Sequence, residues 1–81
     1  DPIIAEVEGT ITFEDIIPEL TAVEQIDDLT DQKRIMINEH ITSGYKPTII
    51  VATDDGQIFR YALEVKTALF VEDGQRVNVA D

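Results

Sequence analysis

Cysteine is absent from the sequence, and histidine, serine and methionine each occur once. Without cysteine the chain has neither a disulfide framework nor a thiolate zinc site. No apolar run approaches the roughly 18 residues that a membrane-spanning helix needs, and no basic segment leads into an apolar one as in a signal peptide. These absences predict a protein of the reducing cytoplasm with no membrane partner.

Basic residues are also scarce, because six lysines and arginines stand against 17 aspartates and glutamates, a formal net charge of -11. Strong binding to nucleic acid depends on lysine and arginine, which displace counterions from phosphates. We therefore expect no strong direct binding to nucleic acid, and an acidic surface that favours basic protein partners. Hydrophobic residues make up 43% of the chain, which is too many for a disordered acidic tail.

The dominant hydrophobic pattern has a period of two. In "AEVEGTITF", one face carries Ala5, Val7, Ile11 and Phe13 in register with Gly9, while acids and threonines alternate on the other face. That alternation is typical of a half-buried strand. The glycine inside the run suggests a bulge or a bend.

Other short β-rich runs follow, with turn residues between them. Residues 19–29 fit either a helical turn or a bulged strand, and their β-rich surroundings favour a strand. The run "TIIVAT" at residues 48–53 is β-branched and nearly continuous, which predicts a core strand. No helix of ordinary length is predicted.

Two acidic turns punctuate the second half of the chain. In "TDDGQ", Gly56 lies between β-rich runs and predicts a hairpin, because glycine takes the positive φ of a type I′ turn. In "LFVEDGQRVNV", Asp73-Gly74 predicts a second hairpin that closes a barrel. About seven or eight short strands result, so we expect an all-β fold, a small hybrid of barrel and sandwich.

Candidate catalytic and metal-binding residues do not combine into a site. His40 has only Glu39 as an adjacent acid, whereas zinc takes three or four ligands. Ser43 lacks the G-x-S-x-G elbow of a nucleophile. The densest acid cluster lacks the glycine and the alternation of an EF-hand loop, and we interpret it as a hydrated turn: Asp27, Asp28 and Asp31. We expect no catalytic, cofactor-binding or metal-binding residue in this chain.

The acidic turns and an aromatic pair also have structural interpretations. Carboxylates act as acid and base only when they face each other in a cleft, so residues 54–56 and 72–74 are interpreted as turns. Phe59 and Tyr61 flank Arg60 as in a strand that stacks nucleic-acid bases, but the net charge opposes that use. We expect the two aromatics on one face of a core strand.

The acidic turn and alternating strand at residues 69–79 also occur near the end of biotinyl and lipoyl carrier domains. Those domains attach their cofactor to a lysine at a hairpin tip, between methionines or after an acid. No lysine of this chain has either context: Lys33, Lys46 and Lys66. The likeness is therefore one of architecture, and a carrier-like domain or an interaction module of another assembly remain alternatives.

The order and spacing of these features resemble the large insertion in the trigger loop of the bacterial RNA polymerase β′ subunit. The segments "DPIIAEVEGTITFEDI", "KPTIIVATDDGQIFRYAL" and "LFVEDGQRVNVAD" carry the resemblance, which covers nearly the whole chain. The positions that match are Pro2, Glu6, Gly9, Phe13, Gly56, Val71, Gly74 and Val77. Residues 1–81 would then form a single sandwich-barrel hybrid motif with biotinyl-lipoyl-like topology, excised from a larger subunit.

The chain departs from that family in two respects. It holds one motif where the well-known insertions contain two or more. It also ends with Asn78-Val79-Ala80-Asp81 where related sequences continue with Gly-Asp-x-Leu-Ala.

The resemblance implies a non-catalytic module that modulates trigger-loop movement, elongation, pausing and transcript cleavage. The parent would be a nucleotidyltransferase that uses magnesium and zinc, neither of them bound here. Its partners would be the β subunit and the rest of β′, together with transcription factors near the secondary channel, and the isolated domain would be monomeric. Outward-alternating residues are candidate docking positions only: Glu6, Glu8, Glu14, Met36 and Glu64.

Overall fold

Seven strands and no helix make up the part of the chain, residues 6–80, that the computed structural model describes. The strands are β1 (Glu6–Glu14), β2 (Ala22–Ile26), β3 (Lys33–Ile37), β4 (Thr48–Thr53), β5 (Ile58–Ala62), β6 (Ala68–Leu69) and β7 (Arg76–Ala80). The predicted all-β fold with seven or eight short strands is confirmed. No helix long and apolar enough to cross a membrane occurs within these residues.

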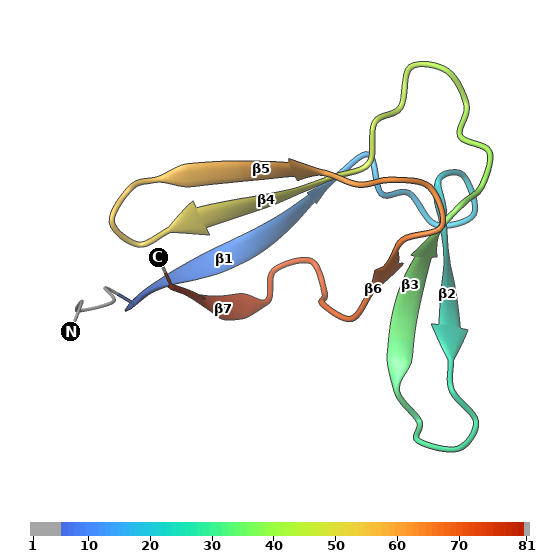
Figure 1. Ribbon diagram of the computed structural model, residues 1–81, viewed down its shortest axis with the longest axis horizontal. Coiled ribbons are helices and arrows are strands. Elements are labelled where there is room, and N and C mark those ends of the chain that lie inside the picture. The colour runs from blue at the N-terminus through green and yellow to red at the C-terminus, as the bar shows by residue number, and fades with distance from the viewer. Residues whose placement is uncertain (1–5, 81) are drawn as a thin grey trace.

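The strands form two antiparallel sheets that meet at a corner. One sheet has the order β5-β4-β1-β7, and the other has the order β2-β3-β6. Figure 1 shows the β2–β3 hairpin running away from the layer formed by β1, β4 and β5. The radius of gyration is 14.5 Å, whereas a compact domain of this length has about 12 Å. The two sheets therefore form an open sandwich rather than a closed one.

The alternation predicted for β1 is confirmed over its described side chains. Ile11 is buried and Thr12 is exposed, and Ala5 lies outside the described residues. A bulge or a bend was predicted at Gly9. The bulge is wrong, because Gly9 pairs with Thr53 and Val77 in an unbroken register. The glycine instead permits a close approach of backbones, because a Cβ there would lie 3.1 Å from the carbonyl oxygen of Ala52.

The strand predicted within residues 19–29 is confirmed as β2. It follows a tight corner in which Asp15 and Glu19 have φ angles of 58° and 69°. The side chain of Thr21 is completely buried at this corner. Its hydroxyl accepts a 2.7 Å hydrogen bond from the Ile17 N–H and donates one of 2.7 Å to the Asp15 carbonyl.

The β4–β5 hairpin is confirmed, but its predicted turn type is wrong. Gly56 has a φ of 91°, whereas neither Asp54 nor Asp55 is among the residues with positive φ. A type I′ turn needs positive φ at both central residues. Here the Gly56 N–H donates to the Thr53 carbonyl at 3.0 Å, so glycine follows the turn as a left-handed residue.

The second predicted hairpin, at residues 69–79, is wrong. β6 pairs with β3 in the three-stranded sheet, while β7 pairs with β1 in the four-stranded sheet. Gly74 has a φ of 88° and its N–H donates to the Ile11 carbonyl at 2.7 Å. The turn residues therefore redirect the chain from one sheet to the other, and long-range pairing with β1 decides where β7 lies.

The most deeply packed apolar residues lie at the corner between the sheets. Ala22, Ile37 and Leu69 of the three-stranded sheet form the buried cluster. Phe13 and Ile49 of the four-stranded sheet pack against it. The small sheet therefore covers one end of the large one.

Candidate interaction surface

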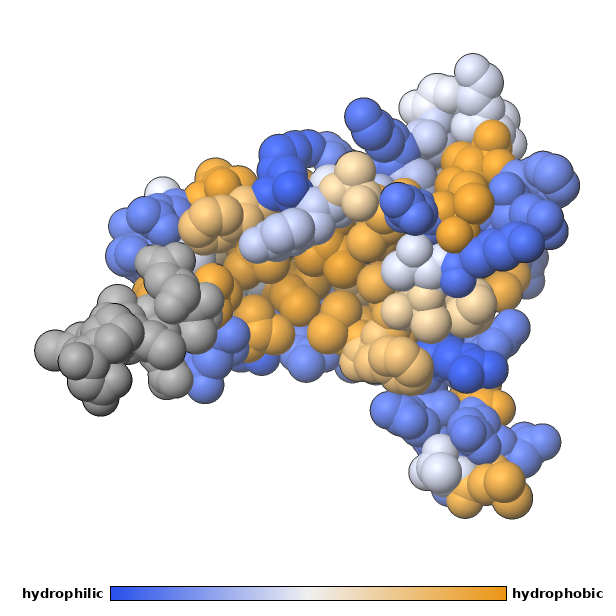
Figure 2. Space-filling view, in the orientation of Figure 1, coloured by the Kyte–Doolittle hydropathy of each residue, from blue (hydrophilic) through white to orange (hydrophobic). Residues whose placement is uncertain are grey.

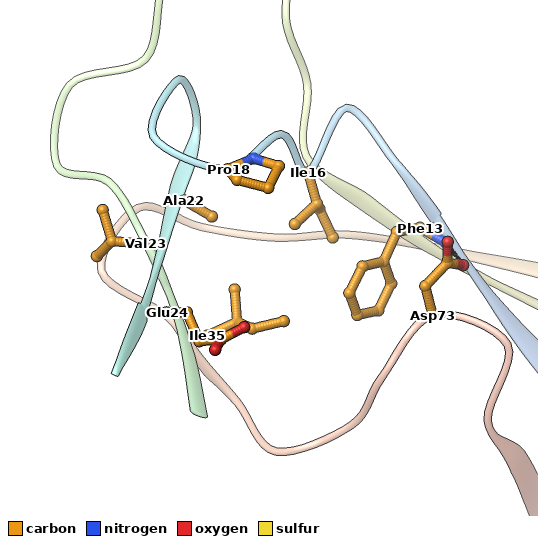
Figure 3. Close-up of a pocket in the computed structure, with 8 residues that line it drawn as sticks. All are labelled: Phe13, Ile16, Pro18, Ala22, Val23, Glu24, Ile35 and Asp73. Carbon is orange, nitrogen blue, oxygen red and sulfur yellow. Dashed lines mark hydrogen bonds between the residues drawn. The ribbon is translucent and has the colours of Figure 1, made fainter. Parts of the chain in front are cut away.

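A pocket of about 290 Å³ lies in the corner between the two sheets. Figure 3 shows Phe13 and Ile16, from the end of β1 and the turn after it, on one side and Ile35 of β3 on the other. Its lining side chains are apolar except for two acids: Phe13, Ile16, Pro18, Ala22, Val23, Glu24, Ile35 and Asp73. The pocket thus offers an apolar surface with little polar chemistry.

Both acids of the pocket already have partners. The Asp73 carboxylate accepts a 2.9 Å hydrogen bond from the Phe13 N–H. The Glu24 carboxylate forms an ion pair with Lys33 at 3.2 Å. Asp73 therefore holds the β6–β7 connection against β1, which is a structural role rather than that of an acid or base.

A larger apolar surface extends from the pocket along the four-stranded sheet. Residues directly opposite each other in antiparallel strands share a face. By this register, one face, called here the apolar sheet face, is formed by Val7, Ile11, Phe13, Ile49, Val51, Phe59, Tyr61, Val77 and Val79. Figure 2 shows a continuous apolar expanse over the middle of this sheet. Phe13 belongs to both the sheet face and the pocket, so the two are one surface.

The aromatic pair lies on this face, as the sequence predicts, but not in a core strand. Phe59 and Tyr61 stand opposite Val51 and Ile49. β5 is an edge strand, and Tyr61 is 52% exposed. Arg60 points to the opposite face and forms an ion pair with Glu14.

The polar face of the same sheet is organised by Arg76. Its guanidinium donates two hydrogen bonds to the Asp54 carboxylate, at 2.7 and 3.0 Å. It also donates to Glu8 and to the Thr10 hydroxyl, each at 2.9 Å. The hydrogen bond from Arg76 holds the pKa of Asp54 below its ordinary value, and the two acids raise the pKa of Arg76. The cluster ties the β4–β5 hairpin to β1 and β7.

Most of the other basic groups are also held by acids. Lys33 contacts Glu24 and Glu72, at 3.2 and 3.5 Å, and the hydrogen bond to Glu24 raises the pKa of Lys33 most. Lys66 contacts Glu39 at 3.3 Å. With 17 acids and six bases in the sequence, these pairs leave a large excess of acids at the surface.

The candidate catalytic and metal-binding residues occupy loops and turns. His40 and Ser43 are exposed, in a bend and a turn between β3 and β4. Asp27, Asp28 and Asp31 lie at the tip of the β2–β3 hairpin, where Asp27 accepts a 2.8 Å hydrogen bond from the Leu29 N–H. Within residues 6–80, no group of three or more histidines, cysteines and acids is placed to hold a metal ion.

Two of the three lysines tested against the carrier motif lie outside the strands. Lys33 begins β3, and Lys46 is in the loop before β4. Lys66 lies in a turn between β5 and β6, with a φ of 66°. β5 ends at Ala62, before this turn.

Two of the four candidate docking acids are engaged in ion pairs within the chain. Glu8 and Glu14 hold Arg76 and Arg60, and Met36 is partly buried. Glu64 is exposed. The side chain of Glu6 is not among those that the structure describes. Sequence reasoning placed Val7, Ile11 and Phe13 on one face of a half-buried strand, and it placed Phe59 and Tyr61 on one face of a core strand. It did not join these residues with Val77 and Val79 into one surface. It also missed Leu29, which is 95% exposed at the β2–β3 tip.

Curated proteins match this chain along its length, although no protein-family model does. The DNA-directed RNA polymerase subunit β′ of Sulfurovum sp. is 54% identical over 81 residues, which is 100% of this chain. The β′ subunit of Nitratiruptor sp. is 58% identical over 80 residues, and that of Campylobacter jejuni is 44% identical over 79, each covering 98% of the chain. The chain spans about 5% of the length of these subunits. The resemblance to the β′ subunit is therefore confirmed.

Proposed function

We propose, from its full-length similarity to a segment of bacterial β′ subunits, that this chain is a non-catalytic module inserted into the trigger loop of RNA polymerase. The trigger loop closes over the incoming nucleotide and opens again in each cycle. A module that makes better contacts in one of these states shifts the equilibrium toward that state. The function proposed is modulation of elongation, pausing and transcript cleavage in this way.

The pairing of the two ends of the described chain supports an insertion. Glu6 and Ala80 are opposite partners in the β1–β7 pair (Figure 1). A chain that enters and leaves at neighbouring points can extend a loop without forcing its two ends apart. Residues 1–81 would thus form one motif of an insert between two elements of the host.

The site chemistry supports a modulator rather than a catalyst. The carboxylates of the corner pocket are bound to a backbone N–H and to Lys33, and Asp54 is bound to Arg76. Nucleotidyl transfer, with its magnesium and zinc ions, would belong to the parent polymerase. A coupling of about 1–3 kcal/mol between docking of the module and loop closure is ordinary for such effects.

The acidic surface supports partners with basic surfaces. A net charge of -11 favours docking on basic regions of β or the rest of β′, and it disfavours binding to DNA. Transcription factors near the secondary channel are further candidate partners. The setting proposed is the bacterial cytoplasm, where transcription takes place.

Replacement of the module by a short Gly-Ser linker in its own polymerase tests the proposal. Pause durations and transcript cleavage are measured on one template for the deletion variant and the unaltered enzyme. We expect pause durations and transcript cleavage to change, because the trigger loop loses a module that favours either its open or its closed state. The matched control carries Thr12→Ala, an exposed position on the polar face of β1. Unchanged pausing and cleavage in the deletion variant would refute the proposal.

A further inference from the structure

Within residues 6–80, only one end of the apolar sheet face has another element packed on it. The three-stranded sheet packs on the end that contains Phe13 and Ile49. Val7, Val77 and Val79, at the other end of the face, are half-buried and do not belong to the packed cluster. Figure 2 shows the apolar surface over the middle of the sheet. A sheet with one apolar face requires a second layer over that face.

The dimensions of the chain show that the second layer is incomplete. The chain measures 43 × 36 × 22 Å, and each described pair of strands in substantial contact consists of two strands of the same sheet. The small sheet turns away from the large one at the corner (Figure 1). Phe59, opposite Val51 in the middle of the face, and Val77, nearer its β1–β7 end, are both half-buried and outside the packed cluster.

The ends of the described chain lie at this uncovered region. Glu6 and Ala80 end the β1–β7 pair beside Val7 and Val79. β7 is also an edge of its sheet, so one side of its backbone is open to a further strand. In the relatives, nearly all of the subunit lies outside the matched segment. Polypeptide that continues from either end would emerge next to the uncovered apolar residues.

A second copy of the chain is a poor occupant of this surface. Each copy carries a net charge of -11, and two copies packed face to face would bring these charges together. Repulsion between them is weakly screened within about 10 Å. Covalent continuity removes this obstacle, because a flanking segment is held close at high effective concentration.

We propose that the part of the apolar sheet face on which no other described element packs, around Val7, Phe59, Val77 and Val79, is completed in the β′ subunit by the polypeptide that immediately flanks this segment. The inference rests on the proposed place of the chain in β′. The flanking segment supplies the missing second layer, so the module and its host are packed together rather than joined by free linkers. Because the two are packed together, the module moves when the host chain moves.

Thiol labelling in the assembled polymerase tests whether the face is covered. The segment has no cysteine of its own. Val77→Cys places a thiol on the apolar sheet face, and Asn78→Cys places one on the exposed opposite face of the same strand. Maleimide labelling is followed by mass spectrometry of this peptide, with rates normalised to the urea-unfolded protein. Val79→Cys repeats the measurement in case Val77→Cys fails to assemble.

We expect the thiol at position 77 to label about tenfold or more slowly than that at position 78, because a covered thiol reacts only after local opening. Similar normalised rates at the two positions would show that the face is open in the polymerase and would overturn the inference.

Photo-cross-linking identifies the occupant. A photoreactive benzoylphenylalanine replaces Phe59 in the assembled polymerase, and cross-linked peptides are sequenced. We expect products with β′ peptides adjacent to this segment in the same chain. Products with a second polymerase, with another subunit or with a remote part of β′ would overturn the choice of occupant. Pausing kinetics of the deletion variant test the proposed function separately, so either proposal can fail while the other stands.

Discussion

At Gly9 the backbones of β1 and β4 approach so closely that a side chain has little room. An added Cβ would lie 3.1 Å from both the Ala52 carbonyl oxygen and Val51 Cγ1, and 3.4 Å from Thr53 Cα. Two of these three neighbours are backbone atoms, which cannot move aside by changing rotamer. Gly9 therefore serves strand packing in the middle of the sheet.

We expect Gly9→Ala to destabilise the chain by about 1–3 kcal/mol, the usual cost of overpacking a packed site. Urea unfolding of the 81-residue chain, followed by circular dichroism, measures the change as a lower midpoint at constant slope. Thr12→Ala, on the exposed face of the same strand, is the control and should shift the midpoint little. A Gly9→Ala midpoint equal to that of the control would show that the strands can separate without cost.

The Asp54–Arg76 pair gives stability a defined dependence on pH. Arg76 lowers the pKa of folded Asp54 from its ordinary value of 3.8. The unfolded state therefore binds the proton more readily than the folded state. The stabilisation is fully present above the unfolded pKa and is lost as pH falls through the lower folded pKa.

We expect the free energy of unfolding of Asp54→Asn to fall below that of the unaltered chain above about pH 5, and the difference to shrink below about pH 4. Urea titrations over this range measure it. Asp28→Asn removes the same charge at an exposed position with no ion pair among the described residues, and it corrects for the relief of net negative charge. A difference between the two variants that does not vary with pH would contradict the assigned role of Asp54.

Among the elements, the corner between β1 and β2 depends on one buried hydroxyl. Thr21 joins the Ile17 N–H to the Asp15 carbonyl through two 2.7 Å hydrogen bonds. Thr21→Val keeps the shape but leaves both partners unsatisfied, so we expect a loss of about 1–3 kcal/mol. Thr21→Ser keeps the hydroxyl and should retain most of the stability. Denaturant midpoints compare the two variants, and equal midpoints would show that the corner does not need the hydroxyl.

Local signals in the sequence predicted the elements that local contacts determine. The β4–β5 hairpin follows from Gly56 between two β-rich runs, because its strands are neighbours in sequence. The same type of signal at Gly74 indicated a turn correctly but a hairpin wrongly. β7 pairs with β1, whose hydrogen bonds to residues 74 and 75 draw the chain away from β6. That choice depends on contacts about 65 residues apart, which a local pattern does not encode.

At the scale of the whole molecule, sequence reasoning identified the apolar residues and the acidic surface but not their arrangement. Alternation correctly placed Ile11 and Phe13 on one face of β1. It could not show that Tyr61 on the same face is exposed, because exposure depends on what covers the sheet. The cover proposed for this face lies in the flanking host chain. The open sandwich and the paired ends both fit a module that is completed by its surroundings.

Single-nucleotide addition by the assembled polymerase, with and without the module, tests the central claim most directly. We expect the deletion variant to keep catalysing bond formation, since the module contributes no catalytic group. Its rate should differ from that of the intact enzyme by about fivefold or more, as a coupling of about 1–3 kcal/mol to loop closure requires. Loss of all nucleotide addition in a correctly assembled enzyme, or a rate identical to that of the intact enzyme, would contradict the account.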